Sequence, residues 1–199
     1  MAVTGLAAFV ALGSTGAEQQ PSITQILATV PQLGGGWTSN RVVVLVDPLS
    51  SPSEMADKNE NPEAWLRFVH DLLRKQPRRE AHAIVRYFGG RTNLYHTNSL
   101  VHIMRWKSKE DIGLNWGLDK ETKDSPGTLP KVGEEVRFSQ RQGMHNNITF
   151  RRGNYLIDVE CATAYGVEHL KRLAEVLDSN FLKAQKALAT KDHDPATQK

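Results

Sequence analysis

The sequence predicts an α+β fold, in which a mostly antiparallel sheet is flanked by helices as an α/β/α sandwich. Two observations carry this prediction. Residues 147–161 spell strand, tight turn and strand, and residues 166–189 follow at once with apolar side chains at helical spacing. The other candidate strands are joined mostly by hairpins, whereas the helices stand apart from them in the sequence. We therefore expect the long C-terminal helix to pack on the sheet.

The start of the chain predicts a short helix and a buried strand. Ser22 can cap a helix through Val30, because apolar residues recur there at helical spacing until Pro31 and the glycines at 34–36. Residues 41–46, Arg-Val-Val-Val-Leu-Val, form an almost continuous β-branched run. Such a run is typical of a strand that is covered on both faces.

A loop, a helix and a second strand are expected next. Residues 48–61 are rich in proline, serine and acidic side chains and predict a loop. Apolar side chains at spacings of three and four over 62–75 predict an amphipathic helix, which Pro77 ends. Residues 81–88 indicate a strand, and the glycines at 89–90 predict a turn after it.

The middle of the chain predicts further strands and a loop. Residues 94–106 indicate one or two strands, with an interruption near Thr97. Ser108 and the acidic residues after it predict a short helix. Residues 119–131 are polar and contain two prolines, so they are the best candidate for a mobile loop, and 132–139 predict a modest strand.

The hairpin at 147–161 turns at Gly153 and Asn154, which supply the positive φ that a two-residue turn requires. The return strand carries four inward side chains, and the final helix carries a single apolar stripe. We expect the two sets to pack together. They are Tyr155, Ile157, Val159 and Cys161 on the strand, and Val167, Leu170, Leu173, Ala174, Leu177, Phe181, Ala184 and Leu188 on the helix.

Length and composition favour one domain. With 199 residues and 39% hydrophobic content, the chain can bury a core without disulfides or a structural metal. Cys161 is the single cysteine, which excludes an intramolecular disulfide and any site built from several cysteines. Lys and Arg number 25 against 22 Asp and Glu, so the surface is mixed rather than polybasic, which argues against nucleic acid as a partner. No cofactor or metal site is predicted.

The N-terminal residues favour export. Residues 1–17 contain no charged side chain, and their apolar run leads into small residues, as in a signal peptide. A basic start is missing, and the alternative is a packed or frayed segment of a cytosolic protein. The run is too short to cross a membrane, and no other segment is suited to do so. We therefore expect a signal peptide at 1–17, one exported domain (periplasmic or secreted) at 18–189, and a disordered tail at 190–199.

Residues 100–182 carry a pattern that resembles PsbP-like domains and related small exported domains of unknown function. A strand leads into a short helix at 101–111, a Val-Gly-acidic loop and strand follow at 132–136, and a hairpin turns through Arg-Gly-Asn within 150–155 before the closing helix. The resemblance covers less than half of the chain, and its motifs are structural. It implies the fold and an accessory or binding role, and it carries no catalytic residue to this chain.

Histidine, cysteine and acidic residues are the candidates for catalysis. His96 and His102 would share a face of one uninterrupted strand, with Cys161 or Glu160 on another strand, and His145 precedes the hairpin. Imidazole can act as acid or base near neutral pH, but no metal-binding spacing such as HExxH occurs. The favoured interpretation is scattered surface and half-buried histidines, a core cysteine, and alternating acids on a solvated strand face.

A cluster of basic residues around the hairpin is the candidate binding site. Guanidinium groups bind phosphate or carboxylate through paired hydrogen bonds, and nearby aromatic rings offer stacking surfaces for single-stranded nucleic acid. The alternative, which we favour, places the rings in the core and the arginine head groups at strand edges. The candidate positions are Arg105, Arg137, Arg141, His145, Arg151 and Arg152.

Three functions remain open from the sequence. The leading hypothesis is a non-enzymatic exported domain that binds an envelope protein or a small anionic ligand. The second is a hydrolase that uses one or more of His96, His102 and His145, and the third is nucleic-acid binding through the arginine-rich hairpin. Burial against the final helix accounts for the rest of the hairpin, so the turn at 151–154 is where we expect a partner first.

Overall fold

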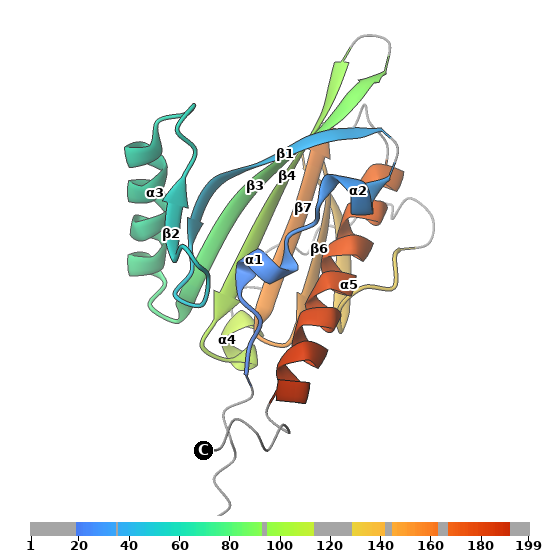
Figure 1. The fold of residues 1–199 in the computed structure, drawn as a ribbon. Coiled ribbons are helices and arrows are strands. Elements are labelled where there is room, and N and C mark those ends of the chain that lie inside the picture. Colours follow the sequence, from blue (N-terminus) through green and yellow to red (C-terminus); the bar gives the residue numbers. More distant parts are fainter. Residues whose placement is uncertain are drawn as a thin grey trace, which may run out of the picture.

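The computed structural model describes residues 19–34, 36–92, 95–113, 129–141, 145–162 and 167–191. In this part of the chain, seven strands form one sheet in the order β2-β1-β3-β4-β7-β6-β5, and every neighbouring pair is antiparallel. Helices flank the sheet, and a long helix closes the chain (Figure 1). The predicted α+β fold is confirmed. The predicted signal peptide, most of the predicted loop at 119–131 and most of the predicted tail lie outside the described residues.

The N-terminal elements differ from the prediction in two places. Instead of one helix through Val30, there are two short helices, because residues 27–29 are not helical and Pro31 lies in the first turn of the second helix rather than ending the first. A three-residue strand lies in the segment predicted as loop and pairs only with the end of β1. The elements are α1 (Ile23–Ile26), α2 (Val30–Leu33), β1 (Trp37–Val46), β2 (Glu54–Ala56) and α3 (Pro62–Lys75).

The later elements follow the predicted order with two corrections. The interruption predicted near Thr97 is wrong, because β4 runs as one strand through that residue. The turn predicted at Gly89 and Gly90 is wrong, because β3 continues through both residues. The register shifts between Phe88 and Arg91, so the glycines mark an irregularity inside a longer hairpin. The elements are β3 (Arg79–Thr92), β4 (Tyr95–Trp106), α4 (Lys109–Gly113), β5 (Glu135–Arg141), β6 (His145–Arg152), β7 (Tyr155–Ala162) and α5 (Val167–Lys191).

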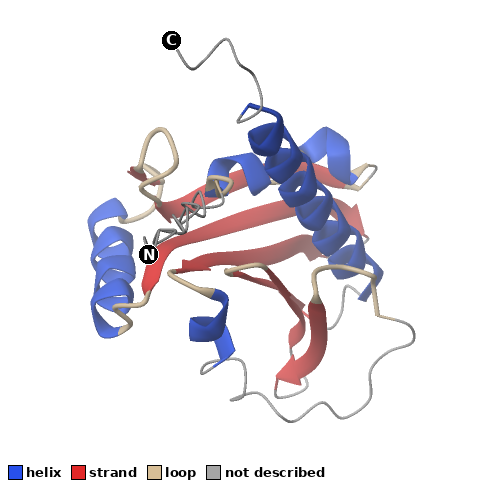
Figure 2. Cartoon of the chain, turned by 90° about the horizontal axis from the view of Figure 1, so that it is seen from below, coloured by secondary structure: helices blue, strands red, loops and turns tan. Residues whose placement is uncertain are grey.

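Apolar side chains hold helices on both faces of the sheet. Figure 2 shows α5 and the two N-terminal helices together on one side, with α3 at the edge formed by β1 and β2. α3 packs on the opposite face, where Val69 meets Val44 and Ile84. The main core lies under α5, and it unites the inward strand residues with most of the predicted helix stripe. Its members include Tyr155, Ile157, Val159, Cys161, Leu170, Leu173, Ala174, Leu177 and Phe181.

α3 begins and ends where the sequence predicts. Its cap is Asn61, whose side-chain oxygen accepts a hydrogen bond from the Ala64 amide at 3.1 Å. Just before the helix, the Glu60 carboxylate accepts hydrogen bonds from Arg41 at 2.8 Å and Arg86 at 2.6 Å, which joins the helix to β1 and β3.

Of the helices that the structure describes, none has both the length and the apolar character needed to cross a membrane.

A buried histidine, His82, contacts a half-buried one, His102, on the α3 side of the sheet. His82 on β3 is 2% exposed, and its Nε2 lies 3.2 Å from Nδ1 of His102 on β4. The other ring nitrogen lies 3.5 Å from the guanidinium of Arg79. Because Arg79 can only donate, we assign His82 Nδ1 as an acceptor and Nε2 as the donor to His102. Burial, and then the charges of His102 and Arg79, hold the pKa of His82 well below its usual value.

This pair makes stability depend on pH. An unfolded histidine has a pKa of about 6.5, so below that pH the unfolded chain binds a proton that folded His82 excludes. The free energy of unfolding therefore falls as the pH drops from about 6.5 toward the lower folded pKa, by up to about 1.4 kcal/mol per pH unit. We expect His82→Gln to flatten this fall, as measured by urea unfolding at pH values on either side of 6.5.

The matched control is His70→Gln on α3, whose side chain is 50% exposed. This variant should keep the wild-type fall in stability on acidification. If His82→Gln retains the same fall as the wild type, the exclusion of a proton from His82 is contradicted.

Candidate functional site

The six predicted binding residues do not form one patch. Arg105 and Arg152 lie on the α5 side of the sheet, since they alternate with the outward residues of their strands and contact buried groups or α5 there. Register places Arg137, His145 and Arg151 on the other face, and Arg141 pairs with His145 across β5 and β6. The sheet therefore separates residues that the sequence placed together.

Carboxylates pair with most of these basic groups. Arg151 lies 2.6 Å from Glu135, and His145 Nδ1 lies 3.0 Å from Glu160. Arg152 makes two hydrogen bonds to the Asp178 carboxylate of α5, at 2.9 and 2.7 Å. The hairpin arginines 151 and 152 are thus already neutralised within the fold, which weakens the case for a free basic patch.

Arg105 forms a buried ion pair that ties the sheet to the N-terminal segment. Its guanidinium is 2% exposed and donates to Asp47, which is fully buried, at 2.7 Å. The same carboxylate accepts hydrogen bonds from the Ser50 hydroxyl at 2.6 Å and from the Ile23 amide, the first of α1, at 2.7 Å. Burial lowers the pKa of Arg105, but Tyr155 and Asp47 outweigh it and leave this pKa raised. Arg105 therefore has a structural role inside the core, where it holds Asp47 and, through it, the start of α1.

The catalytic candidates occupy different environments. The His102 imidazole contacts His82, and register pairs His102 with Asp158, which accepts a hydrogen bond from Thr149 at 2.7 Å. The His96 side chain lies outside the described part of the structure. Cys161 is buried, and burial followed by the nearby Glu160 charge raises the pKa of its thiol to about 11. Among the described residues, no three His, Cys, Asp or Glu side chains are placed to hold a metal ion.

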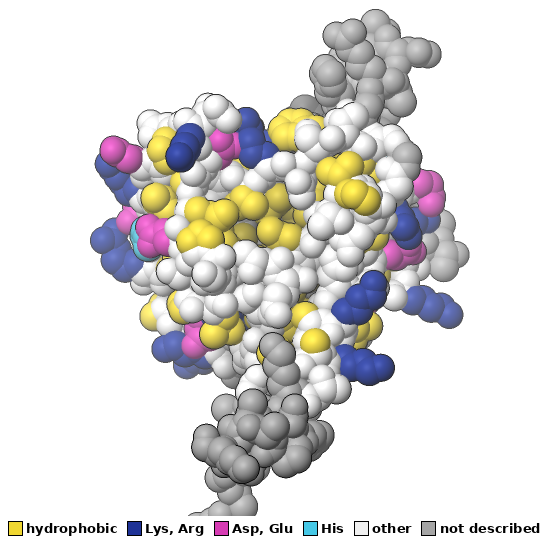
Figure 3. Space-filling view, viewed as in Figure 1, with side chains coloured by type: hydrophobic (Ala, Val, Ile, Leu, Met, Phe, Trp, Pro, Cys, Tyr) yellow, Lys and Arg dark blue, Asp and Glu magenta, His cyan; other side chains and the backbone are white. Residues whose placement is uncertain are grey.

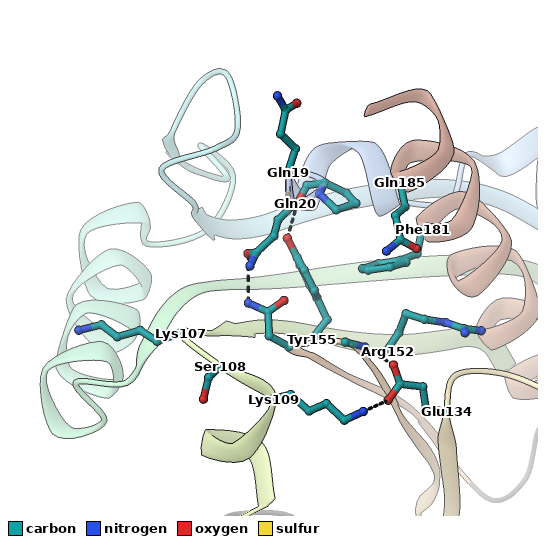
Figure 4. A pocket seen from close by; sticks show the side chains of 13 residues that line it. Gln19, Gln20, Lys107, Ser108, Lys109, Glu134, Arg152, Tyr155, Phe181 and Gln185 are labelled. Atoms are coloured by element: carbon teal, nitrogen blue, oxygen red, sulfur yellow. Dashed lines mark hydrogen bonds and ion pairs between the residues drawn. The ribbon is translucent and has the colours of Figure 1, made fainter. Parts of the chain in front are cut away.

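A pocket of about 420 Å³ opens beside the hairpin turn (Figure 4). Five parts of the chain line it: the N-terminal segment before α1, the entry to α4, the loop before β5, the hairpin turn, and the C-terminal half of α5. The turn that the sequence singled out forms its floor. The lining residues are Gln19, Gln20, Pro21, Lys107, Ser108, Lys109, Glu134, Arg152, Gly153, Asn154, Tyr155, Phe181 and Gln185.

Two glycines with positive φ shape the floor of the pocket. Gly153 turns the hairpin with φ +56°, and Gly133 has φ +63° where a Cβ would lie 2.4 Å from the Arg151 carbonyl oxygen. The chain at Gly133 can therefore press against the hairpin, and the next amide, of Glu134, donates to that carbonyl at 2.7 Å. In return the Gly153 amide donates to the Glu134 carboxylate at 3.0 Å. Hydrogen bonds in both directions thus join the Val-Gly-acidic loop to the Arg-Gly-Asn turn.

The N-terminal segment closes one side of the pocket. The Asn154 amide nitrogen donates to Gln20 at 3.1 Å and also to the Trp106 carbonyl oxygen. The Tyr155 hydroxyl donates to the Pro21 carbonyl oxygen (Figure 4). Burial raises the pKa of Tyr155 to about 12, so this hydroxyl keeps its proton near neutral pH. These bonds bring residues 20–21 against the turn from more than a hundred positions away in the chain.

The charged groups at the rim are mostly compensated. Lys109 lies 3.0 Å from Glu134, and this lysine, followed by the Gly153 amide, lowers the pKa of the Glu134 carboxyl. Arg152 is held by Asp178, as described above. Lys107 is exposed and forms no ion pair with a residue in the described ranges.

The sequence predicted the hairpin turn of this pocket but not its glutamines, because no local pattern links residues 19–20 to residue 185.

Comparisons of the chain with protein-family models, with curated proteins and with solved structures found no match. The resemblance to PsbP-like domains therefore stays a prediction, and so do the functions that the sequence left open.

Arg105 should be among the most costly residues to remove. Substituting Arg105→Met leaves the Asp47 carboxylate buried without its cation, and breaking such a pair costs about 3–5 kcal/mol of folding free energy. Chemical denaturation of both proteins measures this loss. The control is Arg74→Met, whose side chain is 78% exposed and pairs with Asp71 on the same helix. It should cost about 0–1 kcal/mol. Equal costs for the two variants would rule out the anchoring role.

Proposed function

We propose that the protein is a non-enzymatic, exported domain that binds a small ligand or a partner protein at the cell envelope. The observation that carries the proposal is the pocket at the hairpin turn, because concave sites with a few convergent polar groups are where proteins hold ligands. Its lining comes from five parts of the chain, and hydrogen bonds fix the hairpin turn to the N-terminal segment, to the end of β4 and to the loop before β5. A site held in this way is preorganised, so little ordering is needed when a ligand enters.

Two further observations support the proposal. Residues 1–17 carry no charge and join an apolar run to small residues, as a signal peptide does. Two glycines with positive φ shape this place, Gly153 in the hairpin turn and Gly133 in the loop that lies against it. Arg151 and Arg152 are already paired with carboxylates, which argues against nucleic acid as the partner. Binding to nucleic acid needs basic side chains that are free to neutralise phosphates and thereby displace the counterions bound to them.

A hydrolase is the second candidate, favoured by the neighbourhood of His102. Its imidazole contacts His82 and is in register with Asp158, so a base and an orienting carboxylate share one strand pair. His145, the other described candidate, is paired with Glu160 instead. Turnover in a broad screen of ester and peptide substrates that survives the triple substitution of His96, His102 and His145 by alanine would remove this candidate.

Blocking the pocket should abolish binding without unfolding the protein. In Gln185→Trp a large ring on α5 extends into the pocket from a half-buried position. We expect the wild type to retain one set of molecules from an envelope extract, identified by mass spectrometry, and the variant to lose at least about tenfold in retention, equal to about 1.4 kcal/mol. The control is Lys186→Trp, which adds the same ring at the next, exposed position of the helix.

Two results would contradict the proposal. Equal retention by the wild type and Gln185→Trp would show that the pocket is not the binding site. Recovery of the protein only from the cytosolic fraction, with Met1 still present on N-terminal sequencing, would overturn the exported location.

A further inference from the structure

Strand β5 forms a regular, seven-residue edge of the sheet. It is the last strand in the sheet order, and β6 is its only partner among the described strands. Its register with β6 runs from one end to the other without a shift, and it contains no proline. No other described segment exchanges a backbone hydrogen bond with residues 135–141. An edge of this kind presents N–H and C=O groups that can pair with a further strand.

The opposite edge of the sheet is blunted. β2 is only three residues long, and β1 beside it has two register shifts against β3. The segment after β2 crosses to β1, where the Asp57 amide donates to the Val43 carbonyl oxygen and the carboxylates of Asp57 and Glu60 pair with Arg41. Short, irregular and charge-covered edges disfavour pairing with another chain. β5 is therefore the better edge for a further strand.

The charges of β5 are complementary to a second copy of the same strand. Two copies related by a twofold axis perpendicular to the sheet pair antiparallel and keep α5 on the same face. With the axis at Phe138, all seven residues pair, and position 135 (Glu135) of each copy stands opposite position 141 (Arg141) of the other. Arg137 stands opposite Ser139, so no like charges meet. Opposite charges at such cross-strand positions stabilise a ladder.

Other registers of this pairing are less favourable. Moving the axis by one residue, to Arg137 or Ser139, leaves only residues 135–139 or 137–141 paired and sets arginine opposite arginine. Moving the axis further shortens the ladder again. The twofold axis also keeps Val136 and Phe138, which pack toward the core under α5, on one face of the joined sheet. Charge and strand length thus select the pairing about Phe138.

We propose that β5 is the interface of a symmetric dimer, in which two copies of this chain join their sheets by antiparallel pairing of residues 135–141 about Phe138. The Glu135 carboxylate lies 2.6 Å from Arg151, and the Glu135 side chain is still 45% exposed, so a second guanidinium can reach it. Only one strand of each copy forms the ladder, so the contact is small and the dimer is reversible. The inference goes beyond the proposed ligand binding and does not depend on it, because it rests on the sheet edge.

Sedimentation velocity of the full chain, from micromolar to millimolar concentration, tests the dimer. The wild type should shift reversibly from one copy to two as the concentration rises, with no larger species. Glu135→Arg places arginine opposite arginine, and Arg141→Glu places glutamate opposite glutamate. Each variant alone should weaken the dimer at least about tenfold, because both cross-strand charge pairs change from attraction to repulsion.

An equimolar mixture of the two variants tests the register itself. In the mixed dimer, each position 135 again faces the opposite charge at position 141, so the mixture should recover most of the wild-type affinity. The matched controls are Glu63→Arg and Arg74→Glu, which reverse exposed charges on α3. Each control should dimerise like the wild type, and mixing the two controls should not strengthen the dimer.

A wild-type measurement covers the case in which a variant does not fold. Isotope-filtered NMR on a mixture of labelled and unlabelled chains should show intermolecular contacts between residues 135–141 of the two copies. A chain that stays monomeric at millimolar concentration would overturn the proposal, and so would a dimer that both charge reversals leave unchanged. Growth beyond two copies would overturn it as well, because a closed twofold pairing of β5 stops at the dimer.

Discussion

The buried ion pair between Asp47 and Arg105 fixes the N-terminal segment onto the sheet, and the pocket depends on that attachment. Both charged side chains are almost completely removed from water. Each charge would be very unfavourable there without its partner and its hydrogen bonds. Asp47 also accepts the first amide of α1, which places the segment against the sheet. This anchor acts together with the hydrogen bonds from Asn154 to Gln20 and from Tyr155 to Pro21, which hold the segment beside the hairpin turn.

The rest of the pocket follows from close packing between two turns and a helix. Gly133 and Gly153 let the loop before β5 lie directly on the hairpin, and Glu134 joins the two through its backbone amide and its carboxylate. Arg152 fastens the same hairpin to α5 through Asp178. Figure 3 shows apolar surface gathered on the face that includes α1 and β1.

The sequence predicts the elements whose signals are local. Asn61 and Pro62 start α3, Gly153 and Asn154 turn the hairpin, and the apolar stripe defines α5. It could not predict the partners of the arginines, because Arg105 and Asp47 are 58 residues apart and meet only through sheet register. The lining amides are separated further still, and β2 is too short to leave a periodic pattern. The sequence thus located the hairpin turn of the candidate site, but it did not predict the partners of the arginines or the amide side chains that line the pocket.

Hydrogen exchange of individual backbone amides tests the anchoring by Asp47 and Arg105 most directly. In the wild type, the Ile23 and Ala28 amides should be protected, since they donate to Asp47 and to the Tyr87 hydroxyl inside the core. In Arg105→Met, measured where it remains folded, these two amides should lose far more protection than the strand amides of Val101 and Val159. An equal loss at all four positions would contradict the account, because it would show that the ion pair supports the whole fold evenly rather than holding the N-terminal segment.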